Sequence, residues 1–398
     1  MGDPFGLIGQ WLMDLVTGWG MQPVAALTLL RFLGAAILAT VLLLACFLLI
    51  VAERKLLGRF QDRYGPNRVG PWGVFQTVAD FVKLIGKEIV VPDGIDKPVY
   101  WLAPLLVVMS VVGIWAVVPF APGFLGTDLN VGILYIVSVG AIGTLGIIMA
   151  GWSSNNKFAL LGAFRAVAQL VSYEIPMVLT LLVPTMLAGS MGIAAIVEAQ
   201  KDMWFITAAP LAALVFLISS VAENGRAPFD LMEGESEIVA GFNIEYGGLA
   251  FGMFYVGEFL HAFTVGVLFS TLFLGGWQGP GAEQFPLLGL VYFFAKAFVV
   301  WFITVWIRGS FPRVRIDQLL SLNWKFLTPL ALLIVSLTAV VDKLAVEQGW
   351  SRILALLAAN GALFVGTMAV LGAYGRSVRL REERLRATAG GLSTGIAR

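Results

Sequence analysis

The sequence predicts an all-α polytopic membrane protein with about nine transmembrane helices, and two observations support this class. Of the 398 residues, 59% are hydrophobic and 13% charged, and the mean hydropathy is +0.87. Soluble domains are about half apolar and about a quarter charged, so a large soluble core does not account for this composition. The apolar residues are also gathered into long runs, and a helix needs about 20 of them to cross a bilayer.

Nine apolar segments predict the spanning helices in chain order. They cover about residues 27–51, 99–120, 131–151, 167–187, 203–222, 248–273, 286–307, 326–342 and 353–373. No internal repeat relates one half of the sequence to the other. This argues against a transporter that is built from inverted halves.

Lysine and arginine are concentrated in alternate loops. The loops after the first, third, fifth and seventh spans hold eight, two, one and four of them, and the tail after the last span holds six. The N-terminus and the opposite loops together hold three. Because cytoplasmic loops carry the excess of these residues, we expect the N-terminus outside and the long loops and the C-terminus in the cytoplasm.

Two segments predict helices that lie on the membrane surface. Residues 5–19, within an N-terminal segment 1–26, have the apolar spacing of a short interfacial helix. In the first cytoplasmic loop, 52–98, residues 74–89 place apolar side chains on one helical face and Asp80, Lys83, Lys87 and Glu88 on the other. Such an amphipathic helix can serve as an anchor or can wall the entrance of an amphiphile. We expect the basic tail 376–398 to begin as the end of a helix and then to become disordered.

The chain contains one cysteine, Cys46, and one histidine, His261. These two residues cannot form a disulfide within the chain, a cysteine-ligated iron–sulfur cluster, a bis-histidine haem site or a Cys/His zinc site. We therefore expect this chain to hold no such redox centre of its own.

Four ionisable residues fall inside the predicted spans: Arg31, Glu174, Glu258 and Lys296. A charge at mid-bilayer costs about 2.5–3.5 kcal/mol on insertion scales, so such residues usually face the protein interior or water. Arg31 is close enough to a helix end to reach the surface. Glu258 and His261 form an E-x-x-H pair, but di-iron bundles need that pair twice. Each glutamate can be a structural hydrogen-bond partner or can exchange a proton, and both uses stay open.

The loop 222–248 between two apolar spans reads AENGRAPFDLMEGESEIVAGFNIEYGG. It combines one base, Arg226, with six acids: Glu223, Asp230, Glu233, Glu235, Glu237 and Glu245. Closely spaced carboxyl groups titrate as a coupled set. The loop also carries many apolar side chains, which a solvated loop would not. It therefore predicts a proton-holding segment that is buried against a partner or folded into the membrane domain.

These loop residues resemble the signature of a family, the quinone-site membrane subunit of respiratory complex I. This is the H-subunit family of bacterial NADH–quinone oxidoreductase, equivalent to mitochondrial NADH dehydrogenase subunit 1. Three other stretches resemble the same family: AERKLLGRFQDRYGPNRVGPWGVFQTVADFVKLIGKE (52–88), AQLVSYEIPM (168–177) and RGSFPRVRIDQLLSLNWKFLTPL (308–330). The resemblance covers residues 27–345. The N-terminal helix and an additional transmembrane helix in 346–375 exceed the mitochondrial form and suggest a bacterial member.

The resemblance implies a subunit of the bacterial inner (plasma) membrane at the junction of the hydrophilic and membrane arms. Its cytoplasmic loops, 52–98, 223–247 and 308–325, would build most of a chamber for the quinone substrate. NADH, FMN and the iron–sulfur clusters would belong to partner subunits, and small membrane subunits would lead to antiporter-like subunits. Membrane lipid is a further expected contact, whereas nucleic acid is not.

Two sets of site residues follow from the resemblance by position, with no catalytic residue and no metal ligand among them. The quinone chamber would include Arg54, Arg63, Lys83, Arg226, Tyr255, Arg308, Arg313 and Arg315. A proton path would include Glu174, Glu223, Asp230, Glu233, Glu235, Glu237 and Glu258. The arginines could instead be topology charges of the cytoplasmic side. Two other functions stay open: the equivalent subunit of a hydrogenase-type complex, and a stand-alone ion transporter.

Overall fold

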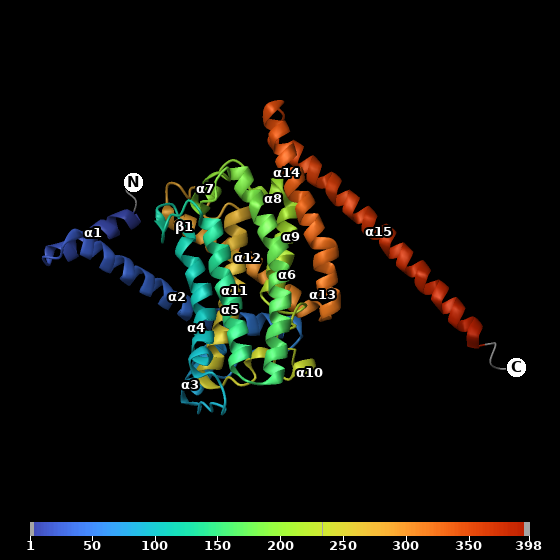
Figure 1. Ribbon diagram of the computed structural model, residues 1–398. Helices are drawn as coiled ribbons and strands as arrows, with labels where there is room; N and C mark the ends of the chain where they lie inside the picture. The colour runs from blue at the N-terminus through green and yellow to red at the C-terminus, as the bar shows by residue number, and fades with distance from the viewer. Residues whose placement is uncertain (1–3, 233, 394–398) are drawn as a thin grey trace.

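The computed structural model describes residues 4–232 and 234–393 and shows a helical bundle (Figure 1). The helices are α1 (Pro4–Gly18), α2 (Pro23–Phe60), α3 (Gln76–Gly86), α4 (Lys97–Ile114), α5 (Gly132–Ser153), α6 (Lys157–Ala188), α7 (Ile193–Glu198), α8 (Phe205–Ala208), α9 (Pro210–Glu223), α10 (Glu235–Ile238), α11 (Gly248–Phe273), α12 (Pro286–Ser310), α13 (Ile316–Leu322), α14 (Thr328–Glu347) and α15 (Arg352–Ser393). Short 3₁₀ turns occupy Pro71–Gly73, Trp115–Val117 and Gly241–Asn243, and a π-helical turn occupies Asn323–Leu327. Strands β1 (Pro119–Ala121) and β2 (Phe124–Leu125) form an antiparallel pair.

The predicted all-α polytopic class is confirmed. Eight helices of the described residues are long and apolar enough to cross a membrane. The expected span 203–222 is the exception, because it is divided into α8 and the 14-residue α9. Pro210 begins α9, and a proline lacks the N–H that would continue the hydrogen bonds of the preceding helix. Eight long helices and one short, broken apolar segment therefore account for the predicted set of about nine spans within the described residues.

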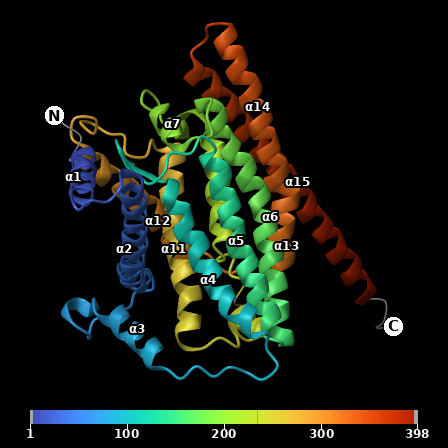
Figure 2. The same ribbon diagram turned by 60° about the vertical axis from the view of Figure 1, so that its left-hand side comes forward.

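Helix α11 is the centre of the bundle, whereas α2 and α15 are much less covered by it. In the most apolar window of α11, 72% of the residues are buried, against 22% in α2 and 11% in α15. Large buried side chains around α11 include Trp115 of the turn after α4, Phe216 of α9 and Trp301 of α12. Figures 1 and 2 show α2 leaving the bundle toward α1, and α15 diverging from α14 along its length.

The two expected surface helices are present. Helix α1 occupies Pro4–Gly18, and α3 occupies Gln76–Gly86 within the first long loop. Helix α3 packs against the bundle through Phe81, whose ring centroid is 5.2 Å from that of Phe47 in α2. Val78, Val82 and Ile85 are exposed. Helix α3 therefore presents an apolar face outward, as an amphipathic surface helix does.

Helix α15 continues to Ser393, within the basic tail 376–398. The expected grading of this tail into disorder stays a prediction. Arginine, leucine, alanine and glutamate dominate this stretch, and these residues have high helix propensity. Residues 394–398 lie outside the described part of the chain.

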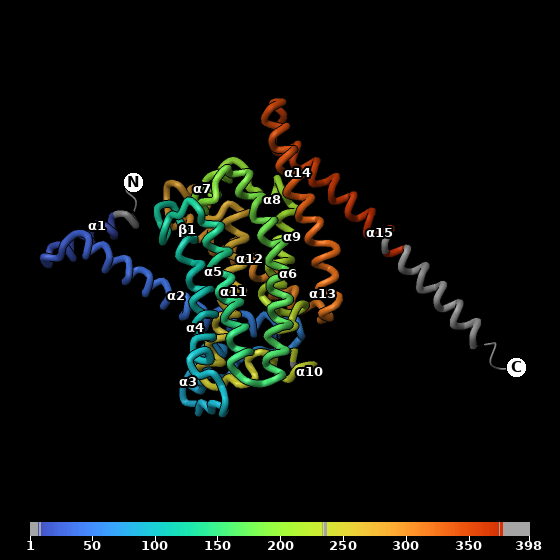
Figure 3. The backbone as a smooth tube through the Cα atoms, viewed as in Figure 1, coloured from blue at the N-terminus to red at the C-terminus, as the bar shows by residue number. Residues whose placement is uncertain are grey.

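The acidic loop after α9 is folded onto the membrane domain, one of the two arrangements that its sequence predicts. Gln169 of α6 donates to the carbonyl oxygens of Ala222 and Phe229 at 2.6 and 2.7 Å. Gly162 of α6 contacts Gly241 so closely that a Cβ at position 162 would lie 2.6 Å from the Gly241 Cα. The loop carries α10 at the same end of the bundle as α3, as the backbone tube in Figure 3 shows. This loop and the loop 52–98 therefore gather at one end.

Candidate functional site

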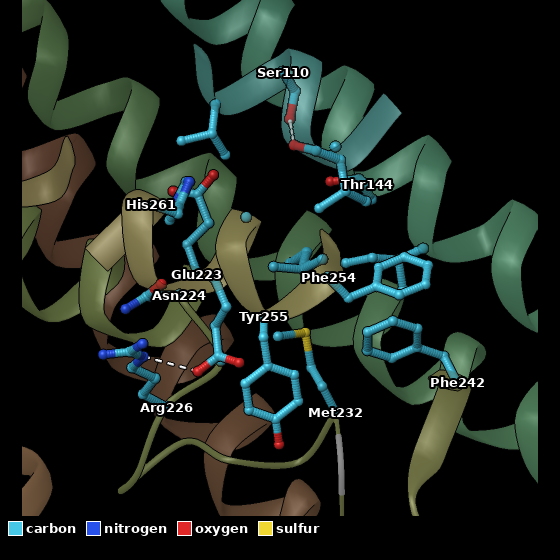
Figure 4. A pocket seen from close by; sticks show the side chains of 18 of the residues that line it. Ser110, Thr144, Glu223, Asn224, Arg226, Met232, Phe242, Phe254, Tyr255 and His261 are labelled. Atoms are coloured by element: carbon cyan, nitrogen blue, oxygen red, sulfur yellow. Dashed lines mark hydrogen bonds and ion pairs between the residues drawn. The ribbon is translucent and has the colours of Figure 1, made fainter. Parts of the chain in front are cut away.

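Arg226 is held by two carboxylates from different helices. It follows Gly225, whose φ of +64° turns the backbone directly after α9. Its Nη1 donates to Glu53 Oε2 of α2 at 2.6 Å, and its Nε donates to Glu258 Oε1 of α11 at 2.8 Å, the interaction that the dashed line from Arg226 marks in Figure 4. The guanidinium carbon also lies 4.4 Å from the centroid of the Phe259 ring. Arg226 is 5% exposed, so these contacts are made away from bulk water.

A second arginine completes the group. Arg308, in the last turn of α12, donates through Nη1 to Glu53 Oε1. Glu53 is fully buried and therefore serves both guanidinium groups. Glu53, Arg226, Glu258 and Arg308 are hereafter the four-charge cluster. It joins α2, the loop after α9, α11 and α12, and its two negative and two positive groups are balanced.

The balance explains how a buried charge is tolerated here. Burial lowers the pKa of Arg226, but Glu258 and Glu53 raise it more, so the pKa lies above its ordinary value. Arg226 therefore stays cationic. Removing one partner of such a buried pair typically costs about 3–5 kcal/mol because the other charge is left uncompensated.

A cavity of about 100 Å³ opens beside the cluster, and its walls combine polar and apolar side chains. It is bounded by α4, α5, α6, the loop after α9, α11 and α12. In Figure 4, Ser110 and Thr144 lie at one end, and Arg226, Met232 and Tyr255 lie at the other. The volume is sufficient for several ordered waters, and the polar groups would hold them.

Small residues make room for this cavity between closely packed helices. A Cβ on Gly143 of α5 would lie 2.7 Å from Ser110 Oγ, and a Cβ on Gly257 of α11 would lie 2.8 Å from Val107 Cγ1. Both glycines line the cavity. The close approach of α4 to α5 and α11 therefore places the Ser110 hydroxyl at the cavity wall.

The structure brings three of the predicted chamber residues to this cavity: Arg226, Tyr255 and Arg308. The others lie elsewhere. Arg54 is paired with Asp80 of α3 at 2.6 Å, Arg63 donates to the side chain of Gln61, and Lys83 is part of α3. Arg313 and Arg315 precede α13 and act electrostatically on Glu237.

Among the predicted proton-path residues, Glu223, Asp230 and Glu258 line the cavity. Glu174 of α6 is close enough to Glu223 for their charges to interact. Glu237 is exposed and accepts a hydrogen bond from Arg165 at 2.5 Å, which lowers its pKa. Glu233, and the side chain of Glu235, lie outside the described part of the chain.

The sequence reasoning missed Glu53, although it is the buried centre of the cluster. Glu53 lies two residues beyond the predicted end of the first span at 51, a position that belongs to the solvated loop if the helix stops there. Helix α2 continues to Phe60 instead. Local sequence gave no signal for Glu53, because an acid beside the bases Arg54 and Lys55 near a helix end has an ordinary explanation in solvent. His261, Asn224 and Asn243 also line the cavity and were not predicted to do so.

Comparison with known proteins agrees with the resemblance seen in the motifs. The profile of a family described as NADH dehydrogenase matches residues 33–339. The protein named as the H subunit of NADH-quinone oxidoreductase from Dehalococcoides mccartyi (strain CBDB1) is 49% identical over 298 residues, which cover 75% of this chain and 82% of the relative. Two proteins of the same name, from Geobacillus kaustophilus (strain HTA426) and Rhodospirillum centenum (strain ATCC 51521 / SW), are 47% and 46% identical. Their matches cover 84% and 77% of this chain, and 98% and 94% of the relatives.

Proposed function

The chain belongs to the NADH dehydrogenase family, whose members include the H subunit of NADH-quinone oxidoreductase, and on this premise we propose that its cavity and four-charge cluster couple quinone reduction to proton translocation. It is a multi-pass membrane subunit that assembles with the other subunits of complex I. The observation that carries the proposal is a balanced, buried group of charges in the wall of a partly polar cavity. Three cavity acids, Glu223, Asp230 and Glu258, adjoin it.

The quinone headgroup would bind at the end of the bundle where the loops gather. Quinone reduction to quinol takes up two electrons and two protons, and the cysteine and histidine count of this chain excludes a cysteine-ligated iron–sulfur cluster or a bis-histidine haem. One cysteine and one histidine cannot hold a cluster, so the electrons would come from an iron–sulfur cluster in a partner subunit. The exposed apolar face of α3 lies at the same end and supports entry of an amphiphile from the bilayer.

The chain's own contribution would be electrostatic. Arg226 and Arg308 are the ion-pair partners of Glu53 and Glu258, because each carboxyl group has a guanidinium within hydrogen-bonding distance. A negative charge that develops on a bound quinone would compete for the same arginines. Protons could then be taken up by the cavity acids, and Ser110 and Thr144 mark the far end of the polar wall. From Glu223 the path would continue to Glu174 of α6.

The orientation follows from the loop charges. The loops 52–98, 223–247 and 308–325 would face the cytoplasm and the hydrophilic subunits, and the N-terminus would face outward. Figure 1 supports this arrangement, since α3 and α10 lie at one end of the bundle, and α7 and the α14–α15 connection lie at the other. The small membrane subunits that lead to the antiporter-like subunits would pack along the side of the bundle.

The test is Arg226→Ala in the assembled complex. Quinone reductase activity with NADH should fall roughly ten-fold or more, the equivalent of about 1.4 kcal/mol or more in the barrier. NADH oxidation by an artificial acceptor upstream should persist. Lys201→Ala is the control, because Lys201 forms an exposed ion pair with Glu283. If both activities of Arg226→Ala fall equally, the residue supports assembly and the proposed coupling role is wrong.

A further inference from the structure

A second, much smaller cavity also has Arg226 in its wall. Its volume is about 10 Å³, and its wall is formed by α9, the loop after it, α11 and α12. It shares Asn224, Arg226 and Arg308 with the larger cavity. Arg226 therefore forms part of the wall of both.

Three polar atoms of residues that line this small cavity have no hydrogen-bond partner within the described part of the chain. They are Ser220 Oγ, Asn224 Oδ1 and Arg226 Nη2. The three residues are 1%, 7% and 5% exposed, so bulk water does not satisfy these atoms. Leaving a buried polar group unsatisfied costs about 1–3 kcal/mol, and more for a charged one. Three such atoms around one small cavity therefore indicate a ligand rather than three separate defects.

We propose that the small cavity is a binding site for one ordered water. A water can accept from Arg226 Nη2, donate to Asn224 Oδ1, and either donate to or accept from the Ser220 hydroxyl, so its hydrogen-bonding groups complement all three atoms. The volume also agrees, since a single water needs roughly 10–15 Å³ of space measured with a water-sized probe. A fourth contact is offered by Thr304, which lines the cavity and whose Oγ1 already donates to the Trp301 carbonyl.

A neutral ligand fits the charges better than an ion does. Arg226 is already compensated by Glu53 and Glu258, so a chloride would add an unbalanced charge to a buried site. A cation would be repelled by the guanidinium. Water adds no charge and completes the contacts of Arg226, whose Nε and Nη1 are bound by carboxylates and whose Nη2 then binds the water.

Ser220 and Asn224 do not belong to the four-charge cluster, but each would hold the Arg226 guanidinium in place through the water. They would therefore act as positioning residues for Arg226. This consequence for activity depends on the proposed function, whereas the water itself does not. If the water is absent, Nη2 loses a partner, and the orientation that serves both carboxylates is less well defined.

The primary experiment is a cryo-EM map of the assembled complex at a resolution that shows ordered waters. A peak within hydrogen-bonding distance of Ser220 Oγ, Asn224 Oδ1 and Arg226 Nη2 is expected, and an empty site in a map with neighbouring waters would overturn the proposal. Replacing chloride with bromide in the buffer should leave the peak height unchanged. A peak that grows with bromide would identify a halide and would also overturn it.

Two matched variants test the positioning role. Ser220→Val should fill the site, displace the water and shift the Arg226 guanidinium in the map, with a several-fold loss of quinone reductase activity in kcat. Ser219→Ala is the control, since Ser219 is equally buried on α9 but does not line the small cavity. Ser220→Val with an unmoved Arg226 and wild-type turnover would contradict the positioning role. If Ser220→Val does not assemble, Ser220→Ala removes the hydroxyl without added volume, and its map should show a weaker water peak.

Discussion

Glu53 is the residue on which the charge balance depends most directly. It is fully buried and accepts from both Arg226 and Arg308. Neutralising it would leave two guanidinium groups with Glu258 as the remaining carboxylate of the cluster. A buried pair that loses one partner is typically destabilised by about 3–5 kcal/mol, so local structure as well as function should respond.

We therefore predict that Glu53→Gln lowers both the yield of assembled complex and its melting temperature. Blue-native gels and thermal unfolding of the purified complex measure these quantities. Glu347→Gln provides the control, because Glu347 is an exposed partner of Lys343. A Glu53→Gln complex with normal yield, melting temperature and turnover would show that the cluster does not need this charge.

Glu258 differs from Glu53 because it is less buried and lines the larger cavity. Glu258→Gln keeps the volume and can still accept a hydrogen bond from Arg226, but it cannot exchange a proton. We expect proton pumping and coupled quinone reduction to fall while the complex still assembles, measured in proteoliposomes with a pH-sensitive dye. A Gln variant that pumps and turns over like the wild type would remove Glu258 from the proton path.

Charged residues in unusual surroundings, such as apolar spans, could be recognised from the sequence as site candidates. A charged residue near a helix end, where charges are common, could not. Glu258 is an acid within an apolar span and Arg226 is a lone base among acids, and both were assigned to the site through the resemblance. The partner Glu53 was not predicted, because an acid near a helix end has an ordinary explanation in solvent. Conversely, Arg54 belongs to a matching motif, yet it forms an exposed pair with Asp80 rather than reaching the cavity. Pairing across the fold cannot be read from local charge.

At the scale of single elements, α3 is attached to α2 by a pair that depends on pH. Partial burial raises the pKa of Asp80, but hydrogen bonds from Arg54 and Gln76 outweigh this, so the pKa lies below the ordinary value of 3.8. The pair therefore stabilises the folded arrangement above that value, and the stabilisation is lost as the pH falls through the lowered pKa. Because both side chains are about a third exposed or more, the contribution is at most about 1 kcal/mol.

We predict that hydrogen-exchange protection of α3 is constant at neutral pH and decreases below about pH 4, with protection factors corrected for the intrinsic rate. Asp80→Asn should reduce the protection at neutral pH by a factor of about five or less and should abolish the acid-dependent decrease. Asp93→Asn, in the same loop, is a control. An unchanged acid profile in Asp80→Asn would exclude the pair as its cause.

Helix α15 covers the break between α8 and α9. The Asn360 side chain donates to the Ala208 carbonyl at 3.0 Å, next to the break at Ala209–Pro210. A backbone group that is freed at membrane depth must find a partner, since lipid offers none. Asn360→Leu should therefore lower the stability of the complex by about 1–3 kcal/mol, seen as a lower melting temperature.

Thr367→Val on the same helix is the matched control, because Thr367 is exposed and bonds within its own helix. Equal melting temperatures for the two variants would mean that α15 does not stabilise the break. The element-level prediction from sequence failed at this point for a related reason. Hydropathy averaged over 203–222 is that of a span, whereas the break at Pro210 depends on a partner roughly 150 residues further along the sequence.

For the whole molecule, the number of cysteine and histidine residues predicts whether the isolated chain can hold a redox cofactor. One cysteine and one histidine cannot hold a cluster, and within the described residues no three His, Cys, Asp or Glu side chains gather as a metal site. The isolated chain, purified in mild detergent, should contain no stoichiometric iron or flavin by elemental analysis and fluorescence. The complete complex, treated identically, should contain both. Stoichiometric iron or flavin bound to the isolated chain would contradict the assignment of these groups to partner subunits.

The all-α class was predictable from composition, because long apolar runs leave few alternatives in a bilayer. The relative placement of helices was not. The central position of α11 depends on which neighbours it meets, and its own hydropathy is lower than that of the peripheral α2. The gathering of loop 52–98 and the acidic loop at one end was predictable from the alternation of loop charge. Successive spanning helices run in opposite directions, so alternate loops lie on the same side.

The 38-residue helix α2 has a mechanical consequence. At about 1.5 Å per residue it is a rod of roughly 57 Å, and the hydrocarbon layer it crosses is only about 30 Å thick. Most of its surface is not covered by the rest of the protein, so the bilayer itself sets much of its tilt. Glu53 lies near the inner end of this rod. We expect the tilt of this helix, and with it the position of Glu53, to respond to bilayer thickness and therefore to lipid composition.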